Sequence, residues 1–213
     1  MHDHAQHTHE RNDRGRLLAA LLLTGSFMVV EAVGGWLAGS LALLADAAHM
    51  LTDTASLLLA WLAFRVTDRP ADRKRTFGYH RFPVLAAFVN ALALLLIVGW
   101  IAFEAIARLL EPTPVLGGAM LAIAAAGLVV NVVAFRLLHG GSQHNLNLRG
   151  AALHVLGDLL GSVGALLAAT IILFTGWTPI DPLLSLVVAA LVLRSAWYLL
   201  REATHVLLEG TPD

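Results

Sequence analysis

The chain has 213 residues, of which 58% are hydrophobic and only 14% are charged, and its formal net charge is −1. Soluble domains carry about 25% charged residues, so this composition argues against a soluble globular protein, and the near-neutral charge offers no basic surface for a nucleic acid. The sequence contains no cysteine, which excludes disulfides and thiolate metal sites and leaves histidine and carboxylate side chains as metal ligands.

The amino-terminal residues 1–16 are polar and precede the first apolar block. They include four irregularly spaced histidines: His2, His4, His7 and His9. A segment with so few apolar residues cannot bury enough surface to offset the entropy of ordering its chain. We therefore expect a disordered, histidine-rich tail here.

Six apolar blocks follow, at residues 17–37, 41–64, 84–107, 115–138, 151–174 and 180–200. Each is close to the ~20 residues that cross the hydrocarbon core of a bilayer as a helix. Strands with open edges leave backbone groups unpaired in lipid, so helices are expected. The first block is too long for a signal peptide, contains Glu31 and lacks a clear cleavage site. The sequence predicts an all-α integral membrane protein with six transmembrane helices.

The connections between these blocks differ in charge. The Gly39-Ser40 turn, the 111–114 segment and residues 175–182 join the blocks on one side, where Arg108 is the only basic neighbour. Every other Lys or Arg lies near the amino terminus, in the two connections of the opposite side or near the carboxy terminus. Basic residues favour the cytoplasmic face. We therefore expect both termini to be cytoplasmic, as in a multi-pass protein of the bacterial inner membrane.

The expected domain organisation is simple. The tail 1–16 leads into a six-helix membrane domain over residues 17–201, and residues 202–213 form a short cytoplasmic tail. These last residues are too few for a further folded domain, so no C-terminal domain is expected. Residues 139–145, between the fourth and fifth blocks, are predicted to be a flexible cytoplasmic connection.

Two histidine–aspartate pairs lie inside the apolar blocks: His49 with Asp53, and His154 with Asp158. Residues four apart share one helix face, and ionisable groups within a membrane usually mark a site or a pathway. Two imidazoles and two carboxylates suit tetrahedral zinc. Each side chain could instead only hydrogen-bond a neighbouring helix, but the repeated spacing favours one shared metal site. Because the second pair lies near the start of its block, equal depth requires an earlier helix start at 146–150, a rotation or a tilt.

Other polar residues in the blocks have more than one interpretation. Asp46 lies seven residues before Asp53, on nearly the same face, and is a candidate outer-shell or proton-accepting group, with a hydrogen bond between helices as an equal alternative. Asn131 and Asn90 are expected to make contacts between helices, with Asn131 also a candidate for the ion path. For Glu31 and Glu104, pairing with arginine and proton acceptance remain equal alternatives.

Three ordered motifs resemble those of cation diffusion facilitators, in their zinc-transporting branch. They are LADAAHMLTD at residues 44–53, FGYHR at 77–81 and HVLGDLLGS at 154–162. The resemblance runs from the first block to Gly210. It implies a homodimeric exporter of Zn²⁺ that works as a proton antiporter by alternating access, with His49, Asp53, His154 and Asp158 as the transport site.

The resemblance has further implications. The histidines of the tail, together with His139 and His144, resemble the family's variable cytoplasmic segments that collect metal, although a merely solvated tail fits them equally well. Zinc is the expected substrate, with Cd²⁺, Co²⁺ or Fe²⁺ as alternatives, and no cofactor is expected. Family members usually continue into a cytoplasmic metal-binding domain, so dimerisation is here expected to depend on the membrane helices.

Two functions from other classes compete with transport. An intramembrane metalloenzyme needs an open coordination position and a general base, whereas four ligands close the shell, and no His-Glu-x-x-His motif occurs. A structural membrane protein would use the same polar residues only to hold helices together. A channel is disfavoured because a complete four-ligand site binds too firmly for rapid conduction. We expect a carrier, not an enzyme.

Overall fold

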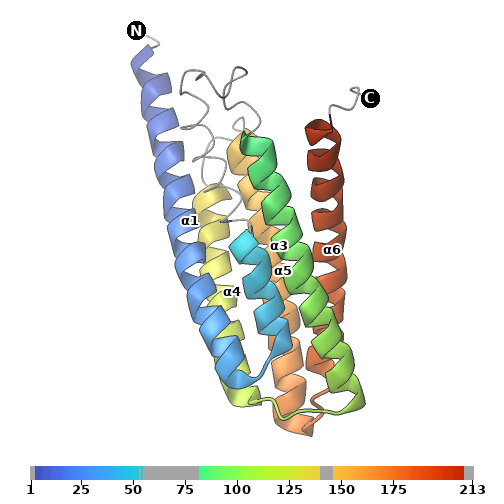
Figure 1. Ribbon diagram of the computed structural model, residues 1–213. Coiled ribbons are helices and arrows are strands. Elements are labelled where there is room, and N and C mark those ends of the chain that lie inside the picture. The colour runs from blue at the N-terminus through green and yellow to red at the C-terminus, as the bar shows by residue number, and fades with distance from the viewer. Residues whose placement is uncertain (1–2, 53, 55–81, 140–145, 209–213) are drawn as a thin grey trace.

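The computed structural model describes residues 3–52, 54, 82–139 and 146–208. These residues form helices and no strand, which confirms the predicted all-α class. A helix over Leu41–Thr52, called helix 41–52 below, follows α1. The labelled helices of Figure 1 are α1 (Asp3–Ala38), α3 (Phe82–Leu110), α4 (Gly117–His139), α5 (Leu146–Thr175) and α6 (Ile180–Leu207).

Five of the described helices, α1, α3, α4, α5 and α6, are long and apolar enough to cross a membrane. Large apolar side chains such as Phe103 and Phe174 are exposed on their outer faces, where lipid is the natural surrounding. The remainder of the predicted second span, after Thr52, lies outside the described residues apart from Thr54. The carboxy-terminal end of α6 and the amino-terminal end of α1 lie at the same end of the bundle (Figure 1).

The amino-terminal segment differs from its prediction. Helix α1 begins at Asp3, so the expectation of a disordered tail over residues 1–16 is wrong from that residue onward. No proline interrupts the sequence between Asp3 and Ala38. Once the apolar part of a helix has formed, each added residue gains a backbone hydrogen bond without a new nucleation cost. The apolar span therefore extends into the polar segment.

The helices pack as two groups. Helix α4 packs against α1 and α5, whereas the main partner of α6 is α3, with a smaller contact to α5. Helix 41–52 contacts both groups: Ala42 and Leu43 pack with residues of α4 and α5, and Ala45 and Ala48 pack against Ile101 of α3. The helix that carries His49 therefore lies between the two groups.

A cluster of small buried residues fills one end of the bundle, near the turn between α1 and helix 41–52. This turn-end core consists of Ala38, Ala42, Leu43, Met120, Ala124, Ala165, Ala168, Ala169 and Ile172. Alanines allow helix backbones to approach closely. In a membrane the hydrophobic effect does not drive helices together, so close van der Waals packing of this kind supplies the attraction. This end of the bundle is tightly closed.

The turn at Gly39 reverses the chain between α1 and helix 41–52, as predicted. Gly39 has φ 69°, a left-handed conformation that side chains other than glycine seldom adopt. Its N–H donates to Trp36 O at 3.2 Å, and the N–H of Ser40 donates to Gly35 O at 2.9 Å. These bonds satisfy carbonyls at the end of α1, so the direction of the next helix is set within two residues.

Candidate metal centre

The structure brings three of the four predicted metal ligands together. One ligand atom each from His49, His154 and Asp158 lie within 4.8 Å of one another. The imidazole rings of His49 and His154 have centroids 5.6 Å apart at an interplanar angle of 61°, and His154 Nε2 lies 3.7 Å from Asp158 Oδ2. The fourth predicted ligand, Asp53, lies outside the described residues.

Helix α5 places His154 and Asp158 at the depth of His49, the described member of the first pair. It begins at Leu146, five residues before the apolar block at 151–174. This is the earlier helix start, at 146–150, that was expected to bring the second pair to equal depth. Leu146 and Leu148 extend the helix-compatible sequence beyond the block. His154 and Asp158 consequently lie in the third and fourth turns of α5, level with His49.

The cluster is slightly wider than a closed zinc site. With metal–ligand bonds of about 2.0–2.1 Å, two ligands of a tetrahedral zinc lie roughly 3.3 Å apart. The observed limit of 4.8 Å is wider than this, so the ligand atoms would have to move closer together to hold an ion. These residues have the donor types that a divalent cation such as zinc requires.

The two sides of the cluster differ in exposure. The Asp158 side chain is 4% exposed, whereas that of His154 is 41% exposed. A charged carboxylate is costly inside a membrane unless a cation or a proton accompanies it. An ion would therefore approach across His154 and be held by the buried Asp158.

Two further buried acids are electrostatic neighbours of Asp158. Glu31 of α1 and Asp46 of helix 41–52 are 2% and 7% exposed, and their side chains are hydrogen-bond partners. Asp46 is an electrostatic neighbour of both Asp158 and His154. Asp46 was predicted to share a face with Asp53, which lies outside the described residues, while Glu31, left between two alternatives, has the acid Asp46 as its hydrogen-bond partner.

Gly161 of α5 makes room for Asp46. A Cβ atom added to Gly161 would lie 3.2 Å from Asp46 Oδ1, closer than ordinary van der Waals contact. Because Gly161 follows Asp158 by three residues, this glycine lets the acidic side chain of helix 41–52 reach the face of α5 that carries the predicted ligand.

The other singled-out residues make contacts between or within helices. Asn131 is buried, and its Nδ2 donates to Ser162 Oγ at 3.0 Å, while its Oδ1 has no hydrogen-bond partner among the described residues. Asn90 Nδ2 lies 3.5 Å from Thr52 O. Both confirm the predicted interhelical contacts. Glu104 accepts a hydrogen bond from Arg108 Nε at 2.9 Å. Of its two alternatives, pairing with arginine and proton acceptance, the structure shows the pairing.

The histidines proposed to collect metal lie in other parts of the chain. His4, His7 and His9 fall on α1, and His2 and His144 lie outside the described residues. His139, predicted to be in a flexible connection, is instead the last residue of α4 and stacks on Phe135 with ring centroids 5.4 Å apart. The amphipathic pattern of α4 continues one residue further than the apolar block suggested.

Sequence reasoning missed one buried acid, Asp181. It was assigned to an external turn, but it is the second residue of α6 and is 0% exposed. Its carboxylate accepts hydrogen bonds from the start of helix 41–52. The available signal was an acid in the first turn of an apolar helix, although Asp181 binds the start of helix 41–52 and does not cap its own helix.

Comparison with known proteins identifies the family. A family model described as the cation efflux transmembrane domain matches residues 17–208. The chain belongs to the cation efflux family. It is 60% identical to the zinc transporter ZitB of Pectobacterium atrosepticum over 213 residues, which cover 100% of this chain and 66% of that protein. It is 59% identical to ZitB of Escherichia coli, covering 99% of this chain and 68% of the relative.

A third member of the cation efflux family is more distant. The chain is 48% identical to a protein of Bacillus velezensis named a cadmium, cobalt and zinc/H(+)-K(+) antiporter, covering 99% of the chain and 67% of that relative. The chain thus spans about two thirds of the length of these curated relatives. Membership confirms the resemblance predicted from the three motifs.

Membership of the cation efflux family also decides between two of the alternatives. The relatives are named transporters, which contradicts the interpretation as an intramembrane metalloenzyme. The five apolar helices and the bacterial relatives identify the chain as a multi-pass protein of the bacterial inner membrane.

Proposed function

We propose that this chain is the membrane unit of a divalent-metal efflux transporter whose main substrate is Zn²⁺. The observation that carries the proposal is the approach of His49, His154 and Asp158 to within 4.8 Å on two helices. Asp53, four residues after His49, is the proposed fourth ligand, because that spacing returns to the same helix face. The names of the relatives, zinc transporter among them, support the choice of metal.

Export is proposed to be coupled to protons. Imidazole and carboxylate bind a metal only when deprotonated, so zinc and protons compete for one site. Asp46 and Glu31, hydrogen-bonded beside Asp158, are the proposed acceptors of protons displaced when zinc arrives. The Bacillus relative, named an antiporter with H(+), supports this exchange.

Alternating access is the proposed cycle. In the described arrangement His154 is 41% exposed, while the turn-end core closes the other end of the bundle. Zinc would enter past His154 from the side that basic residues mark as cytoplasmic. Reorientation of the helices would then open the turn-end core and close the first path, so that the same ligands face the opposite compartment.

Selectivity and assembly belong to the same proposal. Cd²⁺, Co²⁺ and Fe²⁺ accept the same ligand types, and affinity alone separates these metals poorly. A homodimer in the lipid bilayer is proposed, with the membrane helices supplying its contacts. His2, His4, His7, His9, His139 and His144 are proposed to collect metal at the cytoplasmic side.

Flux measurements test the assignment. Proteoliposomes carrying a zinc-sensitive dye would be given an outside zinc pulse and a pH gradient, with wild type compared with Asp158→Ala and His49→Ala. We expect both variants to lose zinc flux and the control Ser195→Ala, whose exposed hydroxyl donates to Leu191 O within α6, to retain it. Equal flux in wild type and Asp158→Ala would contradict the site.

A further inference from the structure

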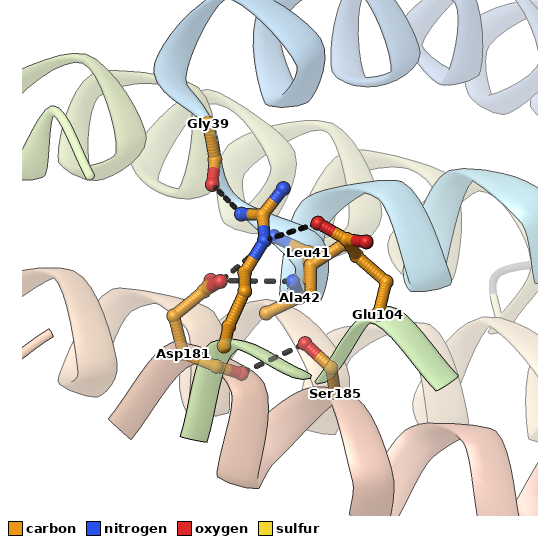
Figure 2. Close-up of polar contacts among 7 residues, drawn as sticks. Gly39, Leu41, Ala42, Glu104, Asp181 and Ser185 are labelled. Carbon is orange, nitrogen blue, oxygen red and sulfur yellow. Dashed lines mark hydrogen bonds and ion pairs between the residues drawn. The ribbon is translucent and has the colours of Figure 1, made fainter. Parts of the chain in front are cut away.

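Asp181 ties the first turn of helix 41–52 to α6. Its Oδ1 accepts a hydrogen bond from Ser40 Oγ at 2.6 Å and lies 3.2 Å from the N–H of Ala42, and its Oδ2 accepts from the N–H of Leu41 at 2.7 Å. Ser40 Oγ also accepts from the N–H of Leu43 at 3.2 Å. Figure 2 shows the carboxylate of Asp181 directed at the backbone of Leu41 and Ala42. A side chain from another helix thus caps helix 41–52.

This link is strong for physical reasons. The first N–H groups of a helix have no partner within the helix, and the helix dipole favours a negative charge at that end. Hydrogen bonds to a carboxylate are short and about twice as strong as neutral ones. Since Asp181 is 0% exposed, loss of these bonds would leave several buried donors unsatisfied, which is costly.

The helix that carries Asp181 is itself firmly held. Helices α3 and α6 share a core, called the α3–α6 core, made of Leu94, Val98, Ala189, Val192 and Ala196. Arg108 of α3 donates to Gly39 O and to Glu104, so α3 also binds the turn that precedes helix 41–52. The start of helix 41–52 is therefore attached by directional polar bonds to both members of this helix pair.

The rest of helix 41–52 meets that pair through contacts of other kinds. Ala45 and Ala48 meet Ile101 through apolar contacts, which carry no angular preference. The described hydrogen bond from this pair to its far end, from Asn90 Nδ2 to Thr52 O, is long at 3.5 Å. The attachment by a buried carboxylate thus lies at one end, while His49 lies eight residues beyond Leu41, or about 12 Å along the axis.

We infer that Asp181 is a positioning residue for transport. It fixes the Leu41 end of helix 41–52 on the α3–α6 pair, so that the end bearing His49 reorients about this fixed point. The inference rests on the proposed transport function. Asp181 does not belong to the metal centre, and its role is mechanical. When the end that bears His49 moves, the first turn of helix 41–52 keeps its position against α6.

A first experiment separates positioning from metal binding in full-length protein. Zinc affinity would be measured by equilibrium titration, and zinc flux in proteoliposomes, for Asp181→Ala, Asp181→Asn and Ser40→Ala. We expect Asp181→Ala to lower maximal flux by about tenfold or more, as a lost charge-assisted link implies, with a zinc Kd within about threefold of wild type. Asp181→Asn, which retains one acceptor oxygen, should recover part of the flux.

Two controls sharpen this experiment. Ser185→Ala removes a buried hydroxyl one turn along α6 that donates to Asp181 O at 2.7 Å and does not reach helix 41–52, and it should leave flux near wild type. The double variant Asp181→Ala/Ser40→Ala should be no slower than Asp181→Ala, because both changes break one link. Wild-type flux in Asp181→Ala, or a parallel loss of zinc binding and flux, would overturn the inference.

A second experiment is independent of flux. Because the chain has no cysteine, spin labels can be placed at Leu44→Cys with Leu183→Cys near the fixed end, and at Leu51→Cys with Leu191→Cys near the other. We expect zinc and protons to change only the 51–191 distance, and Asp181→Ala to broaden the 44–183 distance. A 44–183 distance that shifts with zinc in wild type, or a 51–191 distance that does not, overturns the inference; absence of wild-type zinc flux would instead contradict the proposed function.

Discussion

The imidazole rings of His49 and His154 lie 5.6 Å apart and nearly edge to face, although they belong to helices that make no hairpin with each other. Helix 41–52 brings His49 to this position from a turn bound by α3 and α6, and α5 brings His154 from the other helix group. A relative movement of the two groups therefore changes the distance between these two predicted ligands.

Removal of Asp158 should abolish high-affinity zinc binding. Changes in residues that merely support metal ligands cost about 10–100-fold in affinity, so we expect Asp158→Ala to raise the zinc Kd by at least about 100-fold. Titration calorimetry of purified protein measures this. The matched control is Asp181→Asn, an equally buried acid outside the cluster, whose Kd should remain near wild type.

Zinc binding should weaken as the pH falls. The predicted ligands must lose protons to bind a metal, so we expect the Kd to rise by about tenfold or more between pH 7.5 and 5.5. Calorimetry in buffers of different ionisation enthalpy measures the protons released per zinc. A Kd that stays constant across this range would contradict competition between zinc and protons.

Glu31 should affect proton exchange more than zinc affinity. Its hydrogen bond with Asp46 gives displaced protons a place to bind, and Glu31→Gln retains the shape while removing that capacity. We expect fewer protons released per zinc and a shallower dependence of flux on the pH gradient. Glu104→Gln, which affects only the pair with Arg108, is the control and should release protons like wild type.

Gly161 and Gly157 offer a matched pair on α5. A Cβ at Gly161 would lie 3.2 Å from Asp46 Oδ1, whereas nothing lies within 4 Å of a Cβ at Gly157. We expect Gly161→Ala to destabilise the protein by about 1–3 kcal/mol through overpacking and to slow flux by displacing Asp46. Gly157→Ala should unfold at the wild-type temperature or above, since alanine favours helix. Thermal unfolding in detergent distinguishes the two.

The fold was largely predictable because lipid imposes a simple rule. Residues that cross the bilayer must be apolar and helical, so the blocks at 84–107, 115–138, 151–174 and 180–200 mark α3 to α6, with the largest difference of seven residues at the end of α6. The amino-terminal segment was not predictable in this way, because its polar residues can form either helix or coil in water, where the solvent satisfies backbone groups that have no partner. There the helix continues from the membrane span, and composition alone does not record that connection.

The site was predictable where it depends on local spacing. Residues four apart share a helix face in any helix, which is why His154 and Asp158 could be paired from the sequence. Contacts between distant segments have no such local signal: the hydrogen bonds of Asp181 to Ser40 and of Glu31 to Asp46 arise from packing. Asp53 stays a predicted ligand.

The many alanines of helix 41–52 have a consequence for the speed of the cycle. Ala42, Ala45, Ala47 and Ala48 are all buried, and each presents only a methyl group to its neighbours. Large side chains interlock like teeth and must leave their rotamer wells before two helices slide, whereas methyl groups form a nearly smooth surface. We expect these four positions to add little resistance to sliding, so that the larger buried side chains of the same helix, Leu41, Leu43 and Met50, set how easily it moves.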